Sequence, residues 1–351
     1  MIIKEFGFSI AVTVICLVLA TVYGFNTGGL ATAVSFFTIA TILGVMELSL
    51  SFDNAVVNAS VLKNMTPVWQ QRFLTWGILI AVFGMRFIFP ILIVAVVAQL
   101  GFLEVINMAL NDSTSYAKAL ISAHVPISAF GSTFLMLVFF KYLMDPDKDV
   151  HWFAPLEKRL AQIGRLDTIQ VFITGVLLVL AVQFLVHQEE QFSALISGFI
   201  GILVYVFMDA LGGLFNTDDI ASNAGKAGLV SFMYLEVLDA SFSLDGVIGA
   251  FAITKEIVII SAGLCIGAVF VRSITLLLVK QNTLQAYRYL EHGAHYGIGA
   301  LAFIMLLSTN HDIKIPELVT GLIGVGFIVW SIFSSMQYNK NNPVSQKTKD
   351  S

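Results

Sequence analysis

Long apolar stretches separated by short polar segments constrain this chain more than any other feature. A helix needs roughly 20 mostly apolar residues to cross the hydrocarbon core of a bilayer. Of the 351 residues, 57% are hydrophobic and only 12% are charged, so a soluble fold would lack the polar side chains that cover its surface. The sequence therefore predicts an all-α membrane protein with about ten transmembrane helices, over residues 6–24, 30–62, 72–98, 119–143, 168–187, 192–211, 228–254, 256–280, 295–309 and 315–336.

Composition excludes several other classes of protein. The net charge of −4 gives no basic field for a polyanion, so no nucleic-acid partner is expected. Both cysteines, Cys16 and Cys265, lie in apolar stretches, which excludes a disulfide framework and a cysteine-based zinc site. The first apolar stretch has no basic leader and no small-residue cleavage site, so we expect it to be a retained span.

The Lys and Arg residues predict an orientation. If the N-terminus is cytoplasmic, fourteen of the 19 Lys and Arg residues lie on the cytoplasmic side and three on the other side. Because cytoplasmic loops carry an excess of these residues, we expect a multi-pass protein of the cell (inner) membrane with both termini in the cytoplasm. This orientation places a cytoplasmic loop over 144–167 and a disordered cytoplasmic tail over 339–351.

The chain contains an internal repeat. Glu47-Leu-Ser-Leu-Ser-Phe-Asp-Asn54 matches Asp239-Ala-Ser-Phe-Ser-Leu-Asp-Gly246, and three weaker matches follow in the same order. Partners lie five predicted spans apart, and an odd step reverses direction in the membrane. The sequence thus predicts two inverted five-helix repeats, 1–187 and 188–338, an arrangement typical of secondary transporters with a site at the repeat interface.

Charged and polar residues inside the predicted spans mark a candidate site, because a charge at the bilayer centre is costly unless paired or hydrated. Four acids and two arginines leave two formal negative charges, which one divalent cation would balance. Oxygen ligands favour a hard cation such as Mg²⁺, Ca²⁺ or Mn²⁺. The candidate ligands are Glu47, Asp53, Asn54, Asp239 and Asp245; the supporting or coupling residues are Ser49, Ser51, Asn58, Arg86, His124, Glu236, Ser241, Ser243, Arg272 and His295.

Helical geometry leaves two arrangements open. In one straight helix, Glu47 and Asp53 fall on different stripes. Either the helix breaks around residues 49–52 and frees backbone carbonyls, or one acid faces the ion and the other an arginine. A structural alternative is that the arginines only clamp the acids, and that His124 and His295 are helix-end residues.

The segment from Glu47 to Asn54, followed by Ala-Val-Val, resembles the motif of the TerC family of bacterial membrane proteins. That family is related in architecture to LysE-type exporters and to cation exchangers. The resemblance implies export of manganese(II), with Glu47, Asp53 and Asn54 as ligands from the first motif and Asp239 and Asp245 from the second. Gly246 replaces the asparagine in the second copy, and ten spans indicate a longer branch of the family.

These observations together predict a membrane transporter, not an enzyme, that exports a divalent cation with manganese(II) as first candidate. No permanently bound cofactor is expected. The expected partners are the metal cation, the lipid bilayer, and either a second copy of the chain or a cytoplasmic protein. The alternatives are an organic-solute exporter, a metal-handling or partner-docking membrane protein, and an intramembrane lipid-phosphate enzyme, although no phosphate-cradling loop lies beside the acids.

Overall fold

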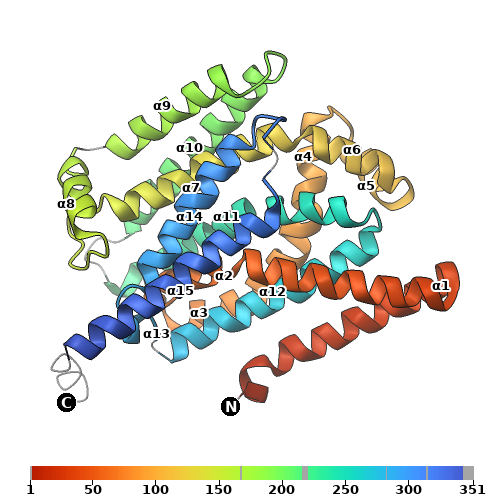
Figure 1. The fold of residues 1–351 in the computed structure, drawn as a ribbon, viewed down its shortest axis with the longest axis horizontal. Coiled ribbons are helices and arrows are strands. Elements are labelled where there is room, and N and C mark those ends of the chain that lie inside the picture. The colour runs from red at the N-terminus through yellow and green to blue at the C-terminus, as the bar shows by residue number, and fades with distance from the viewer. Residues whose placement is uncertain (1, 167, 216–219, 282, 314, 343–351) are drawn as a thin grey trace.

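The computed structural model describes residues 2–166, 168–215, 220–281, 283–313 and 315–342, and every regular element in these ranges is a helix (Figure 1). The elements η1 and η2 are π-helices. Along the chain the order is α1 (Ile2–Leu50), α2 (Phe52–Leu62), α3 (Pro67–Arg72), η1 (Phe73–Gly77), η2 (Ile80–Ile88), α4 (Phe89–Val97), α5 (Phe102–Asn111), α6 (Ser113–Ser122), α7 (His124–Leu143), α8 (Ala154–Ile163), α9 (Ile169–Phe184), α10 (Gln191–Phe215), α11 (Ile220–Ile253), α12 (Ile257–Lys280), α13 (Thr283–Ala286), α14 (Leu290–Leu307) and α15 (Glu317–Asn341).

The first helix reverses direction at two glycines. Gly28 and Gly29 leave helical geometry, and Gly29 has a φ of +73°, which glycine adopts without steric cost. The two arms of α1 therefore run back alongside each other, and α1 packs along α12 (Figure 1). This reversal falls between the first two predicted spans.

A fully enclosed helix lies at the centre of the bundle. Sixteen of the 20 residues of α7 are buried, and α7 packs against α9, α10, α11 and α14. A helix that is apolar on all sides is stable only when other helices surround it. The largest hydrophobic core forms around α7, and this core fixes the positions of α11 and α14.

Six helices of the described chain are long and apolar enough to cross a membrane, or seven if the bent pair Pro67–Gly77 and Ile80–Val96 forms one span. Large apolar side chains point outward on several helices, including Phe25, Phe172, Phe184 and Phe192, which are 60–77% exposed. Such an apolar exterior suits lipid rather than water, so the fold is that of a multi-pass membrane protein. With only 16 residues, α9 is not among the six, and neither is α11, which carries the three acids Glu236, Asp239 and Asp245.

Several predicted boundaries were wrong. Two helices, α5 and α6, lie between the third and fourth predicted spans, and α6 is capped by the Asp112 side chain, which accepts from the Ser115 N–H at 3.0 Å. The fourth predicted span begins at His124 rather than at 119. The predicted tail starts later, because α15 extends to Asn341 and is held there by Asn339 Nδ2, which donates to Ala286 O at 3.1 Å. Residues 343–351 of that tail lie outside the described residues.

Candidate functional site

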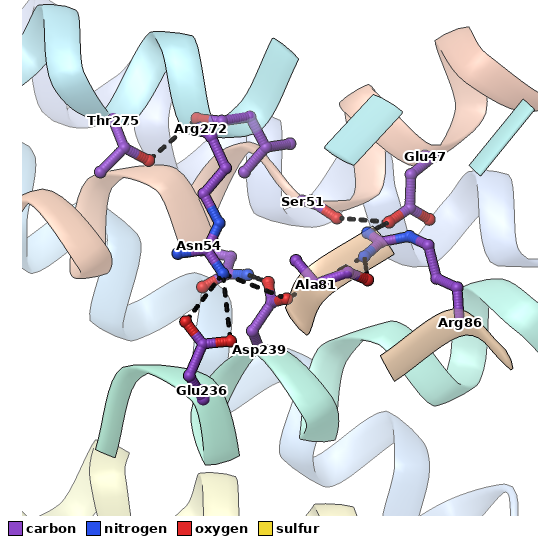
Figure 2. Close-up of polar contacts among 10 residues, drawn as sticks. Glu47, Ser51, Asn54, Ala81, Arg86, Glu236, Asp239, Arg272 and Thr275 are labelled. Atoms are coloured by element: carbon purple, nitrogen blue, oxygen red, sulfur yellow. Dashed lines mark hydrogen bonds and ion pairs between the residues drawn. The ribbon is translucent and has the colours of Figure 1, made fainter. Parts of the chain in front are cut away.

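The two copies of the repeated motif meet at a buried cluster of charged side chains, to which α1, η2, α11 and α12 contribute (Figure 2). Asp239 lies at its centre. Asp239 Oδ1 accepts a hydrogen bond from Asn54 Nδ2 at 2.8 Å, while Oδ2 lies 3.6 Å from Arg272 Nη2 and 4.0 Å from Arg86 Nη1. One carboxylate therefore contacts both arginines. We call Glu47, Arg86, Glu236, Asp239 and Arg272 the charge cluster.

Glu47 and Arg86 form the first ion pair of the charge cluster. Their side chains are 1% and 3% exposed, and Arg86 Nη2 donates directly to Glu47 Oε1. Ser51 Oγ donates to the same carboxylate at 3.4 Å, and Arg86 Nη1 donates to the Ala81 carbonyl at 2.6 Å. Arg86 lies within the π-helix η2, a distortion that is frequent at functional sites.

Glu236 and Arg272 form the second ion pair. Arg272 Nη2 lies 3.3 Å and 3.5 Å from the two oxygens of Glu236, and its guanidinium carbon lies 3.9 Å from the centre of the Phe73 ring. Figure 2 shows the Glu236 and Asp239 carboxylates converging on the Arg272 head group. Arg272 also contacts Asp239, the first acid of the second motif, as Arg86 contacts Glu47, the first acid of the first motif.

The two motif copies run antiparallel. The last residue of the first motif, Asn54, faces the first residue of the second motif, Asp239. The first residue of the first motif, Glu47, faces the last residue of the second motif, Gly246. A Cβ atom added at Gly246 would lie 2.6 Å from Glu47 Oε2. The departure from asparagine at position 246 therefore has a physical reason, because only a residue without a side chain leaves room for the Glu47 carboxylate.

Asp53 lies apart from the charge cluster. The bend at Ser51, with φ −104° and ψ 14°, separates α1 from α2, yet the bonds from Ser51 N to Glu47 O and from Ala55 N to Ser51 O continue across it. The carbonyls of Glu47 and Ser51 are therefore already paired. The structure therefore has a bend within residues 49–52, and Glu47 faces an arginine while Asp53 does not.

A small cavity adjoins Asp53. Its Oδ1 accepts the Asn54 N–H at 2.9 Å, whereas a Cβ atom added at either Gly297 or Gly324 would lie 3.2 Å from its Oδ2. The cavity has a volume of about 20 Å³, enough for one particle of the size of a water molecule. We call it the Asp53 cavity; its lining residues are Leu50, Asp53, Phe242, Gly246, Leu301, Thr320, Gly321 and Gly324.

Several buried polar atoms along the α2–α11 interface have no hydrogen-bond partner. These include Asn54 Oδ1, both amide atoms of Asn58, Asp239 Oδ2 and Ser243 Oγ. Asn54 and Asn58 are one helical turn apart, and so are Asp239 and Ser243. Buried polar atoms are normally paired, so an unpaired set points to a water or an ion. From Glu47 to Asn58 this polar stripe extends about 16 Å along the helix axis.

The described residues contain no preformed metal centre. Within the part of the chain that the structure describes, no group of three His, Cys, Asp or Glu side chains is placed to hold a metal ion. The physical reason is that the arginines already occupy the predicted ligands Glu47 and Asp239. Asp245 belongs to α11, but its side chain lies outside the described residues.

Four predicted supporting residues lie away from the charge cluster. Ser49 is exposed and donates to the Val45 carbonyl at 2.8 Å. Ser241 donates to its own helix, at the Val237 carbonyl. His124 is the first residue of α7 and lies 3.3 Å from Ser128 Oγ. His295 lies in the second turn of α14, where its ring stacks on that of Tyr142 at 3.7 Å.

The comparisons with known proteins identify a family. The model of the family described as "Protein of unknown function (DUF475)" matches residues 52–342. The chain belongs to this family. The match includes Arg86, both acids of the second motif and Arg272, while Glu47 lies just before it. No curated protein and no solved structure matches the chain.

Two glycines beside Asp53 were missed by the sequence analysis. Gly297 on α14 and Gly324 on α15 belong to apolar stretches that contain many glycines, and a single sequence does not show which of them touches a carboxylate. The sequence contained one weak signal. Thr320-Gly321 repeats Thr174-Gly175 of the first half, and these two residues also line the Asp53 cavity.

A glycine-to-alanine pair tests the packing around Glu47. A Cβ atom at Gly267 would lie well inside van der Waals contact with Glu47 Cβ and Cγ. We expect Gly267→Ala to lower the free energy of unfolding by about 1–3 kcal/mol, since overpacking forces shifts in the surrounding side chains. Thermal unfolding in detergent measures the effect. Gly326→Ala is the matched control, because a Cβ there meets nothing within 4 Å; equal effects of the two changes would contradict the described packing.

Proposed function

We propose that this protein is a secondary transporter that exports a hard divalent cation, with manganese(II) as first candidate. The two motif copies and Glu236 bring together four buried carboxylates (Glu47, Asp53, Glu236 and Asp239) and two buried guanidinium groups (Arg86 and Arg272), which leaves two formal negative charges among these six side chains. Isolated buried charges are strongly disfavoured, so this excess must be met by bound cations or protons. One divalent cation or two protons would balance it.

The observation that carries the proposal is the row of buried oxygens between α2 and α11 that have no hydrogen-bond partner, of which Asp239 Oδ2 lies 3.6 Å from Arg272 Nη2. Asn54 Oδ1, Asn58 Oδ1, Asp239 Oδ2 and Ser243 Oγ are carboxylate, amide and hydroxyl oxygens, which suit Mg²⁺, Ca²⁺ or Mn²⁺ rather than Zn²⁺ or Cu⁺. They line a polar stripe across apolar helices. Antiparallel motif copies with a charged site between them also suit the ten-span inverted-repeat architecture that the sequence predicts.

In the structure Arg86 pairs with Glu47, and both arginines contact Asp239. Arg86 and Arg272 neutralise Glu47 and Asp239 while no cation is bound, and they must release these carboxylates when a cation enters. The resemblance to the TerC family supports the choice of manganese(II) and the outward direction, with the motif acids as ligands.

Total cell metal, measured by elemental mass spectrometry, tests this proposal. We expect a selective fall in manganese in cells that overproduce the wild-type protein. Cells that contain the same amount of the Asp239→Asn variant should keep their manganese, because Asp239 contacts both arginines and Asn54. Unchanged metal contents with both proteins present in the membrane would contradict cation export.

A second candidate function has its own observation. An apolar cavity of about 630 Å³ opens between η2, α4, α7, α10 and α11, and its lining contains Glu236 and Ser197 among hydrophobic side chains. Such a cavity is of the size and character that bind small organic ligands. An exporter of an amphipathic organic solute would use it, and such an exporter would leave the metal content of the cells unchanged.

A further inference from the structure

The segment between α7 and α9 carries a fully buried acid that plays no part in the charge cluster. Glu157, in the first turn of α8, is 0% exposed. Its Oε1 accepts the N–H groups of Trp152 at 3.2 Å and Phe153 at 3.0 Å and the hydroxyl of Tyr296 at 3.1 Å. A surface helix does not need a buried carboxylate, so this acid serves to attach the segment.

Cationic and imidazole groups complete the surroundings of Glu157. Its Oε2 lies 3.0 Å from Lys148 Nζ and 3.6 Å from His292 Nε2. Burial raises the pKa of Glu157. The Phe153 N–H, Lys148 and His292 together lower it by more than burial raises it, so the pKa of Glu157 is below its usual value. The carboxylate is therefore ionised at neutral pH, and this attachment weakens only as the pH falls through the lowered pKa.

The same segment contacts two helices of the bundle. His292 Nε2 on α14 donates to the Val150 carbonyl at 2.9 Å. The rings of Trp152 and Phe153 pack on Trp330 of α15, with centroid distances of 5.1 Å and 5.3 Å. We call residues 148–157 the α8 latch.

Both helices held by the α8 latch also form the walls around Asp53. Gly297 of α14 follows directly after Tyr296, the residue that binds Glu157, and is about 7.5 Å along the axis from His292. Gly324 of α15 is about 9 Å along its axis from Trp330. A Cβ atom at either glycine would lie 3.2 Å from Asp53 Oδ2. The α8 latch therefore fixes both walls of the Asp53 cavity within two helical turns of the carboxylate.

We infer that the α8 latch is a lid that keeps the Asp53 cavity closed toward its own face of the membrane, and that Glu157 is the positioning residue that fastens it. The inference deepens the proposed function and rests on it, because it makes Asp53 a group that a cation or proton must reach. Release of Glu157 frees α14 and α15 to separate, and their separation opens the cavity.

Cysteine labelling tests the lid without requiring transport. Thr320, which lines the Asp53 cavity and is 7% exposed, is replaced by cysteine, a side chain of similar size. A small membrane-impermeant cationic thiol reagent is added to vesicles of both orientations. Labelling of the parent protein, which keeps its two native cysteines, is subtracted.

We expect Glu157→Gln to increase the rate of Thr320→Cys labelling about tenfold from one face only. This corresponds to a loss of ~1.4 kcal/mol from the closed state. Asp149→Asn, the same change of charge at an exposed position of the same segment, should leave the rate unchanged. Tyr296→Phe removes only one hydroxyl from Glu157 and should give a smaller increase at the same face, which keeps the test valid if Glu157→Gln folds poorly.

Two results would overturn the lid. One is a labelling rate that Glu157→Gln and Tyr296→Phe leave at the wild-type value. The other is an equal increase in Asp149→Asn, which would assign the effect to loop charge alone. Faster labelling together with a lack of cation transport would instead support the lid and contradict the proposed function, so the two failures are distinguishable.

Discussion

Asp53→Asn is expected to abolish cation transport while the protein stays folded in the membrane. Asp53 is 5% exposed, and no ion pair to it is found among the described residues. Asparagine has the same shape, keeps an oxygen that accepts the Asn54 N–H, and removes the charge. Since an unpaired buried carboxylate is costly, the variant should unfold at the same temperature as the wild type or a higher one.

Loss of transport without loss of stability distinguishes function from structure at this position. A residue that only stabilises the fold would lower the unfolding temperature when changed. Transport is measured as manganese flux into vesicles, and thermal unfolding is measured in detergent. Asp209→Asn is the matched control, because Asp209 is exposed and pairs at the surface with Lys141 at 3.2 Å; it should transport normally. Wild-type flux in Asp53→Asn would remove this acid from the proposed mechanism.

Much of the charge cluster could be predicted from the sequence, because charge inside an apolar helix has few stable solutions. The acids of two motif copies and the arginines of the following helices had to meet, since each would otherwise be buried without a partner. Glu47, Arg86, Asp239 and Arg272 do meet, and Glu236, one turn before Asp239, joins them.

The partners of each acid could not be predicted in the same way. Whether Asp53 faces an arginine or a glycine-lined cavity depends on how α14 and α15 pack, and apolar periodicity does not determine that packing. Ser49 shares the motif with Ser51 but is exposed, because two residues of α1 turn its side chain about 200° away from that of Glu47. Glu157 was missed for a different reason: it lies in a polar segment, where an acid is expected to be solvated, and only the tertiary fold buries it.

Arg86→Met is expected to be the most destabilising single change in the charge cluster. It removes the cation that donates to Glu47, a carboxylate 1% exposed, and leaves the Ala81 carbonyl without its side-chain donor. Removal of one partner from a buried ion pair costs about 3–5 kcal/mol, because the remaining charge stays buried. The unfolding temperature in detergent should therefore fall sharply. Arg72→Met, which changes an exposed arginine stacked 4.4 Å from Trp69, should have a small effect.

The double variant Glu47→Gln/Arg86→Met should recover most of that stability, since two neutral side chains of similar size leave no unpaired charge. Because the double variant is stable, its transport rate distinguishes a purely structural role of Glu47 and Arg86 from a role of Glu47 in cation binding. If the ion pair between Glu47 and Arg86 only holds α1 against η2, the stable double variant should transport at the wild-type rate. If Glu47 is a cation ligand that Arg86 protects between transport cycles, the double variant should be stable and inactive, and this is the result that we expect. An unfolding temperature that stays low in the double variant would instead mean that the ion pair is not the source of the loss.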